Sequence, residues 1–152
     1  MQKEKKFKPK PGQVDFTKIR WSPVINCVLE YKGNILILER NKNMRLYPGY
    51  WNGISGFLDD DKGLKEKVYE ELKEEVGINK EDVISIKVGQ IFDRDESKYK
   101  KTWIVHPILV KVKTNKIKLD FENRNYKWIK LEEIKDFKLL PGFETVIKNL
   151  FE

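Results

Sequence analysis

The sequence predicts an α/β fold, a sandwich in which helices cover a mixed β-sheet. Runs rich in β-branched residues lie on both sides of one internal helical pattern, and a second helical pattern ends the chain. The 152 residues suffice for one domain that buries its own core without disulfides or structural metals. We therefore expect a single globular unit.

The first 18 residues differ in character from the rest of the chain. They carry Pro9, Pro11 and Gly12 among many charges, a composition typical of a mobile segment. We expect a basic flexible arm over residues 1–18, followed by the folded domain over residues 19–152.

A β-hairpin is predicted at the start of this domain. Two β-branched runs, VINCVLEY (residues 24–31) and NILILER (residues 34–40), flank Lys32 and Gly33, and the glycine supplies the turn. A loop rich in turn formers follows, and the short run ISGFL (residues 54–58) then predicts a third strand.

The internal helix is predicted to begin near Leu64 and to end at Gly77. Its apolar residues recur every four positions and so lie on one helical face: Leu64, Val68, Leu72 and Val76. Gly77 is expected to be the C-terminal cap, because glycine readily adopts the left-handed conformation found there.

The second half of the chain predicts three more strands and a terminal helix. Residues 103–112 (WIVHPILVKV) are apolar enough for a central strand despite Pro107. Pro141 is expected near the first helical position of the terminal helix. The elements follow in the order strand 83–92, polar loop 93–101, strand 103–112, strand 126–130, helical turn 131–136 and helix 141–151.

The charge of the chain favours anionic partners. There are 31 basic and 24 acidic residues, so the net charge is +7. The excess is concentrated in two clusters: Lys3, Lys5, Lys6, Lys8 and Lys10, and then Arg94, Lys98, Lys100 and Lys101. Such clusters attract polyphosphates and nucleic acids, including RNA, although solvated lysine-rich surfaces explain the N-terminal cluster equally well.

The sequence indicates a soluble protein. No apolar run approaches the roughly 20 residues that span a bilayer, and the basic N-terminus lacks the apolar core of a signal peptide. We expect a cytoplasmic protein, monomeric or homodimeric, without a membrane partner. The single Cys27 cannot form an intramolecular disulfide and is expected in the core. The only histidine, His106, lies in an apolar strand and is expected to be a hydrogen-bonded core residue.

The internal helix carries more carboxylates than an ordinary surface helix needs. Glu71, Glu74 and Glu75 stand at i, i+3 and i+4, so they project from one side and can share a cation. Mg²⁺ binds a few carboxylates and keeps waters or substrate phosphates as its other ligands. The alternative is a solvated amphipathic helix in which Lys67 pairs with Glu71.

This stretch resembles the Nudix box, whose pattern is G-x5-E-x7-R-E-U-x-E-E-x-G-U, where U is a bulky aliphatic residue. The spacing is met from Gly56 to Ile78, and the pattern residues present are Gly56, Glu71, Leu72, Glu74, Glu75, Gly77 and Ile78. The resemblance extends over about residues 20 to 151. It implies a Nudix-like α/β/α sandwich with a mixed sheet.

Two positions depart from the pattern. Lys62 stands where the family has its first glutamate, and Glu70 stands where it has an arginine that holds the box glutamates in position. Lys67 or Lys73, each one helical turn from Glu70, is expected to compensate Glu70. Lys62 is expected to place positive charge beside the phosphates of the substrate.

The resemblance implies a Mg²⁺-dependent pyrophosphohydrolase, with Mn²⁺ as an alternative cation. Nudix enzymes hydrolyse a nucleoside diphosphate linked to another moiety, by attack of water on phosphorus. Metal ligation maps onto Glu71, Glu74 and Glu75, with Gly56 in the same site, and catalytic roles are expected for Glu71 and Glu74. Glu122, just before a late strand, corresponds to an extra carboxylate that acts as ligand or base in some members.

Substrate contacts are predicted from residue type and place in the sequence. Arg40 ends a predicted strand and has the reach for bidentate contact with a phosphate, and Arg94 belongs to the second basic cluster. Trp51 is the main candidate for stacking on a nucleobase; the weaker aromatic candidates are Tyr47, Tyr50 and Trp103.

Two other functions are compatible with the resemblance. A catalytically degenerate Nudix-fold module would bind a nucleotide or RNA without cleaving it, because a fold does not guarantee an activity. An isomerase of isoprenoid diphosphates would need a further cysteine and histidine metal set. This chain has one cysteine and one histidine, too few for such a metal set, so the sequence argues against the isomerase.

Overall fold

A computed structural model describes residues 8–152, and its centre is a mixed eight-stranded sheet. The strands follow the order β3-β2-β1-β7-β5, with β4 beside β1, β6 beside β7 and β8 beside β2. Their bounds are β1 Trp21–Tyr31, β2 Asn34–Arg40, β3 Trp51–Asn52, β4 Ile54–Phe57, β5 Val83–Val88, β6 Phe92–Glu96, β7 Lys101–Val112 and β8 Asn123–Ile129.

The central pair, β1 and β7, is parallel and in register from Trp21 opposite Thr102 to Glu30 opposite Lys111. The predicted hairpin is confirmed, because β1 and β2 are antiparallel across Lys32 and Gly33. Every other pairing in the sheet is also antiparallel. The predicted mixed sheet is therefore confirmed.

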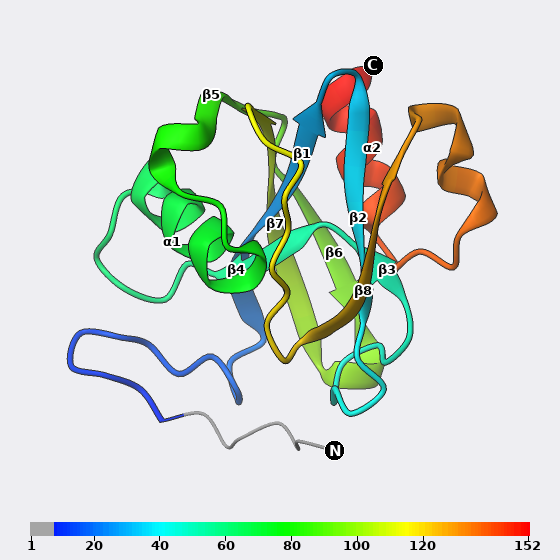
Figure 1. The fold of residues 1–152 in the computed structure, drawn as a ribbon. Coiled ribbons are helices and arrows are strands. Elements are labelled where there is room, and N and C mark those ends of the chain that lie inside the picture. Colours follow the sequence, from blue (N-terminus) through cyan, green and yellow to red (C-terminus); the bar gives the residue numbers. More distant parts are fainter. Residues whose placement is uncertain (1–7) are drawn as a thin grey trace.

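Helices cover both faces of this sheet (Figure 1). Helix α1 (Leu64–Val76) packs its apolar stripe on one face, and α2 (Phe143–Phe151) packs on the other. Three short 3₁₀ helices, η1 Lys80–Asp82, η2 Ser97–Tyr99 and η3 Leu131–Asp136, complete the fold. Cys27 is buried among the residues of the α1-side core, as predicted. No helix in residues 8–152 combines the length and apolar character needed to cross a membrane.

A glycine marks the C-terminal end of α1 and the N-terminal end of α2. Gly77 adopts the left-handed conformation, φ 70°, and ends α1 as predicted. The terminal helix begins at Phe143, two residues after Pro141, and Gly142 is its N-cap with φ 95°. Another residue would be strained in this conformation, and its Cβ, 2.9 Å from Nε of Arg94, would also displace that side chain.

The predicted polar loop over residues 93–101 is wrong, because most of it belongs to an antiparallel hairpin. Strand β6 pairs with β7 from Phe92 opposite Val105 to Glu96 opposite Lys101. Asp93 and Asp95 are exposed, whereas Arg94 and Glu96 are half-buried on the opposite side of the strand. The strand is polar on both sides, which explains why its sequence looks like a loop.

The single strand predicted over residues 83–92 is divided into β5 and β6 by a break at Gly89. Pro107 of β7 faces this break, and its carbonyl accepts a hydrogen bond from the Gly89 N–H at 2.8 Å. The backbone N–H that proline lacks would point to the same side of the strand. The break therefore explains why β7 tolerates a proline near its middle.

Candidate active site

Helix α1 brings three carboxylates together at one edge of a cavity. Carboxylate oxygens of Glu70, Glu71 and Glu74 all lie within 4.8 Å of one another. Within residues 8–152 this is the one group of three or more Asp, Glu, His or Cys side chains that is close enough to hold a common cation. The helical spacing predicted from the sequence thus brings Glu71 and Glu74 together, but the third member of the group is Glu70 and not the predicted Glu75.

Glu71 lies directly against β4, because Gly56 has no side chain. A Cβ on Gly56 would lie 2.5 Å from Cδ of Glu71. Burial first, and then the charge of Glu74, raise the pKa of Glu71 from 4.5 to about 8, although the Lys67 ammonium opposes the rise. Glu71 therefore carries a proton readily until a cation replaces it.

Glu75 lies deeper, with only 4% of its surface exposed. Its Oε1 accepts a hydrogen bond from Asn123 at 3.2 Å, while Oε2 is buried without a hydrogen-bond partner among the described residues. Burial and then the charge of Glu122 raise the pKa of Glu75 well above its usual range. A buried carboxylate oxygen without a partner is costly, and a hard divalent cation beside Glu71 and Glu75 would offset that cost.

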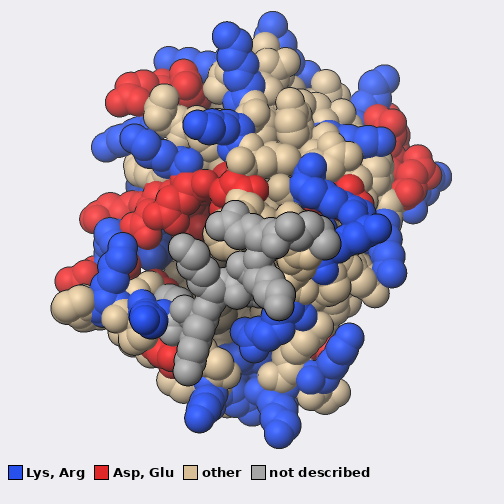
Figure 2. Space-filling view, turned by 60° about the horizontal axis from the view of Figure 1, so that its bottom comes forward, with Lys and Arg blue, Asp and Glu red and all other residues tan. Residues whose placement is uncertain are grey.

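The cavity beside these carboxylates has a volume of about 410 Å³. Glu71, Glu74 and Glu122 line it, together with cationic and aromatic side chains. Its charged and aromatic lining residues include Arg40, Arg45, Arg94 and Lys101, and Phe16, Tyr47, Phe57, Tyr99 and Trp103. Figure 2 shows a continuous band of Asp and Glu on this side of the molecule, with Lys and Arg on either side. The cavity thus combines a cation site with groups that suit an anionic, partly aromatic ligand.

Both predicted arginines line the cavity and are held by defined contacts. Arg40 ends β2, is 8% exposed, and donates from Nε to the Leu46 carbonyl at 2.8 Å. Arg94 extends from β6 and contacts Glu96 at 2.6 Å and the Tyr47 hydroxyl at 3.4 Å. Burial and the hydrogen bond to Glu96 raise the pKa of Tyr47 to about 12. Tyr47 therefore remains a neutral hydroxyl in the cavity wall.

The structure does not bring Trp51 to the cavity. Its ring packs edge-on against Phe137, with 5.1 Å between ring centroids, and belongs to the core beneath α2. Trp103, a weaker candidate from the sequence, lines the cavity instead. Tyr47 lines it as well, whereas the Tyr50 ring lies beneath the Lys138 ammonium.

An unpredicted wall of the cavity comes from the segment before β1. The Phe16 ring stacks on Phe57 with centroids 5.8 Å apart and planes 7° apart, and Phe57 in turn contacts Trp103. Val14, Phe16 and Ile19 are the apolar residues within an otherwise polar segment. Apolar residues in a polar segment indicate that it packs against the domain, and these three could have predicted this wall of the cavity.

This segment is fastened to the domain at both ends. Near its start, Gln13 donates to Asp59 Oδ2 at 2.8 Å, and the Val14 N–H donates to the Asp59 carbonyl at 2.6 Å. Near its end, Lys101 donates to the carbonyls of Phe16 and Ile19. Residues 13–19 therefore have a defined place beside the carboxylates, whereas residues 1–7 of the predicted arm lie outside the described residues.

Comparison with known proteins identifies the family. The model of the NUDIX domain matches residues 20–150. This chain belongs to the Nudix family. It is accordingly a hydrolase of phosphoric anhydride bonds, in agreement with the resemblance of residues 56–78 to the Nudix box.

Solved Nudix structures share the fold of this chain. A MutT protein from Methanosarcina mazei is 23% identical with a TM-score of 0.71, and the match covers 86% of this chain and 93% of that one. An Ap4A hydrolase from C. elegans, solved as a binary complex, is 19% identical with a TM-score of 0.67, covering 85% and 94%. The NUDIX domain of Shewanella oneidensis NrtR, solved with ADP ribose, is 15% identical with a TM-score of 0.72, covering 88% and 87%. A search of curated proteins finds no match.

The structure does not support the isomerase hypothesis, which needs cysteine and histidine ligands for a metal. Cys27 is 1% exposed in the core, and the His106 ring is hydrogen-bonded through Nδ1 to the Val24 carbonyl at 3.0 Å. Neither belongs to a group of potential metal ligands within residues 8–152. The candidate Nudix site is built from carboxylates.

The raised pKa of Glu71 predicts a pH-dependent stability for the metal-free protein. The folded state holds the Glu71 proton up to a pH of about 8, whereas the unfolded chain releases it near 4.5, so stability falls as pH rises through that window. The melting temperature should therefore decrease from pH 5 to pH 8 without divalent cations, and saturating Mg²⁺ should reverse the decrease because it replaces the proton. In Glu71→Gln the decrease should be smaller. A melting temperature that rises over this range in the metal-free protein would contradict the prediction.

Proposed function

We propose that this protein is a Mg²⁺-dependent Nudix pyrophosphohydrolase that cleaves a nucleoside diphosphate linked to another moiety. The observation that carries the proposal is one cavity lined by Glu71, Glu74 and Glu122 and also by cationic and aromatic side chains. Mn²⁺ is the alternative cation, since it accepts the same oxygen ligands.

Glu71 and Glu74, whose carboxylate oxygens lie within 4.8 Å of each other, would hold the cation together with the buried Glu75, and Gly56 leaves the space that Glu71 needs. The cation, when bound, supplies positive charge that neutralises phosphate oxygens and lowers the pKa of a bound water. Burial of Glu75 and the crowding of carboxylates around it suit this role, because each feature favours a partner of opposite charge.

The reaction forms a bond from a water oxygen to phosphorus and breaks the anhydride bond between that phosphorus and the bridging oxygen. Glu122 enters the cavity from the segment before β8, on a different element from the α1 glutamates, and we assign it the role of accepting the water proton. Arg40 and Arg94 bind the phosphate oxygens and orient the diphosphate. Positioning and charge stabilisation therefore carry most of the catalysis.

A nucleotide is the substrate class that the cavity supports best. Phe16, Phe57 and Trp103 form an aromatic surface beside the charged groups, and such rings stack on any nucleobase. Two structural relatives are described with nucleotide ligands or substrates, one with ADP ribose and one as an Ap4A hydrolase. Both observations favour a base linked to a diphosphate.

The test is turnover against a panel of phosphoric anhydrides in Mg²⁺ and in Mn²⁺. The panel contains nucleoside triphosphates, dinucleoside polyphosphates, nucleotide sugars, ADP ribose and capped RNA. Release of a nucleoside phosphate that depends on the cation supports the proposal. Thermal stabilisation by a nucleotide without any product would instead favour the binding module.

The aromatic wall predicts a role for Phe16 in substrate affinity. Phe16→Ala should raise KM for a nucleotide substrate about tenfold and change kcat little, because a stacked base loses one side of its platform. Tyr126→Ala, which removes an exposed ring of β8 outside the cavity, is the control and should leave KM unchanged. Steady-state kinetics measure both constants. An unchanged KM in Phe16→Ala would show that the base binds elsewhere.

A further inference from the structure

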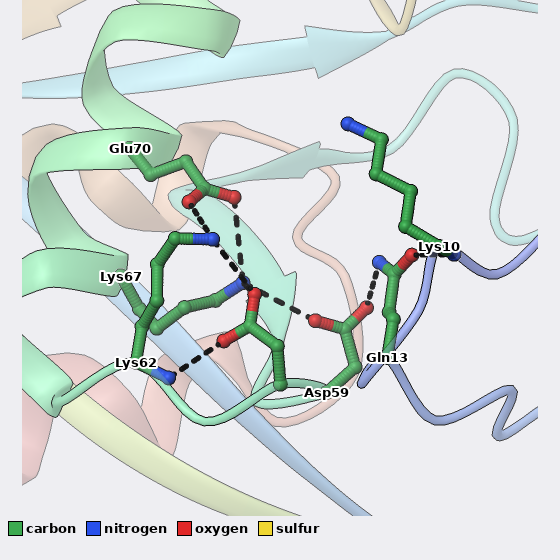
Figure 3. Close-up of polar contacts among 7 residues, drawn as sticks. Lys10, Gln13, Asp59, Lys62, Lys67 and Glu70 are labelled. Atoms are coloured by element: carbon green, nitrogen blue, oxygen red, sulfur yellow. Dashed lines mark hydrogen bonds and ion pairs between the residues drawn. The ribbon is translucent and has the colours of Figure 1, made fainter.

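The two residues that depart from the Nudix pattern contact each other. Nζ of Lys62 lies 3.0 Å from Oε2 of Glu70 (Figure 3). The family pattern has glutamate and arginine at these positions, so both charges are reversed here while their sum is unchanged. Lys62 does not line the cavity, and its predicted place beside the substrate phosphates is therefore not supported.

A second lysine completes the contacts of Glu70. Lys67 is 2% exposed, and its Nζ lies 3.4 Å from Oε1 of Glu70, so each carboxylate oxygen of Glu70 faces an ammonium group. The same Nζ lies 3.2 Å from Asp59 and 3.1 Å from Asp60. Of the two lysines predicted to compensate Glu70, Lys67 therefore makes the contact, whereas Lys73 is exposed.

These contacts join α1 to the loop that precedes it. Asp60 binds both Lys62 and Lys67, at 3.0 and 3.1 Å. Asp59 binds Lys67 and also accepts the hydrogen bond from Gln13, which fixes the segment before β1 (Figure 3). A buried ammonium group needs such partners, because an unpaired one costs several kcal/mol. The loop, the helix and the N-terminal wall of the cavity therefore share one charge network.

The position of Glu70 makes this network relevant to the cation site. An oxygen of Glu70 lies within 4.8 Å of oxygens of Glu71 and Glu74. Without a partner, Glu70 would add a repulsive charge beside these two carboxylates and would compete with them for the cation. With both oxygens bound to ammonium groups, Glu70 is directed toward the loop and leaves Glu71 and Glu74 facing the cavity.

We propose that Lys62 and Glu70 are a charge-reversed positioning pair, which holds Glu71 and Glu74 in place with the opposite polarity to the pattern of the family. Neither residue is catalytic, because the pair acts through the carboxylates that it orients. The proposal rests on the cation site of the proposed function. Its distinctive consequence is that the two departures depend on each other and should be tolerated only together.

The test is a double-mutant cycle on the full chain with Lys62→Glu, Glu70→Arg and the combined variant. Lys62→Glu places a third carboxylate beside Asp60 and Glu70, and Glu70→Arg places a third cation beside Lys62 and Lys67. Each single change should weaken Mg²⁺ binding by more than about tenfold, and the combined variant should recover to within about tenfold of the unmodified protein. Lys65→Glu, the same charge change at an exposed position of α1, is the control.

Mg²⁺ affinity is measured by titration calorimetry with the metal alone, and turnover and melting temperature are measured in parallel. A loss of Mg²⁺ affinity at an unchanged melting temperature distinguishes a positioning role from a general structural one. Because the calorimetric arm does not need a substrate, it tests the pair even if no phosphoric anhydride is cleaved. Additive losses, or single variants that bind Mg²⁺ normally, would overturn the proposal.

A milder cycle covers the case in which a reversed single variant does not fold. Lys62→Gln and Glu70→Gln remove the ion pair without adding repulsion. If the Lys62–Glu70 ion pair positions the ligands, each single change should weaken Mg²⁺ binding by about threefold. The combined variant should show the same loss, because the first change has already broken the pair. Losses that multiply in the combined variant would show that the two residues act separately.

Discussion

Glu74→Gln is expected to lower turnover at least about a thousandfold, roughly 4 kcal/mol of barrier, while leaving the fold intact. Glu74 is exposed, so an amide of the same shape costs little stability. The amide lacks the charge with which Glu74 and Glu71 would hold a divalent cation. Glu74 is also the largest charge that raises the pKa of Glu71, so that pKa should fall in the variant. The measurement is kcat/KM at saturating Mg²⁺, together with the melting temperature.

Two further variants separate this effect from a general loss of charge. Glu66→Gln removes an exposed carboxylate from the first turn of α1 and should leave turnover unchanged. Glu122→Gln should lower kcat while Mg²⁺ affinity is retained, because Glu122 is assigned to the water proton. Normal turnover of Glu74→Gln at low Mg²⁺ would place the cation elsewhere, and equal loss of kcat and metal affinity in Glu122→Gln would make that residue a ligand.

The sequence predicts best those parts whose side chains face the core. The stripe of Leu64, Val68, Leu72 and Val76 predicts α1 and its C-terminal cap because burial enforces a helical period. Strand β6 carries no such signal, since its half-buried residues Arg94 and Glu96 contact Tyr47 in the cavity wall rather than the apolar core. The polar sequence of β6 is therefore typical of a loop, and only its pairing with β7 shows that it is a strand.

The site was predictable only where a local spacing encodes it. Glu71 and Glu74 lie on one helix at a spacing of three, so their convergence follows from the sequence alone, whereas the deep burial of Glu75 depends on how the helix packs. The Phe16 contact with Phe57 joins positions 41 residues apart, and nothing local in either one indicates the other. Trp51 and Trp103 show the same limit, because only the register of the sheet decides which ring faces the cavity and which the core.

The two departures from the Nudix pattern illustrate a further limit. Each is visible in the sequence as the replacement of one pattern residue by a residue of opposite charge, and the sequence does not show that the two side chains meet. The 3.0 Å contact between Lys62 and Glu70 shows that they are partners, so their charges must be considered together. Whether a departure from the pattern damages the site depends on the distance between the two side chains in the folded protein, which the sequence does not give.

Gly56→Ala is expected to lower turnover about a hundredfold, roughly 2.7 kcal/mol of barrier, although it adds a single methyl group. The new Cβ would lie 2.5 Å from Cδ and Oε1 of Glu71, closer than contact allows, so the carboxylate must move away from β4. The atoms displaced are the end of a flexible side chain, and the fold should therefore survive.

Gly53→Ala is the control, because its added methyl group would meet a backbone oxygen, whereas the one on Gly56 would meet the end of the Glu71 side chain. Its Cβ would lie 2.6 Å from the Cys27 backbone carbonyl of β1, which cannot rotate away, so this variant should lose melting temperature. Gly56→Ala should instead keep its melting temperature, require more Mg²⁺ for half-maximal turnover, and lose the fall in metal-free stability between pH 5 and pH 8 as Glu71 becomes hydrated. If Gly56→Ala kept full turnover at limiting Mg²⁺, the close approach of Glu71 to β4 would have no part in binding the cation, and Glu74 and Glu75 would have to hold it without Glu71.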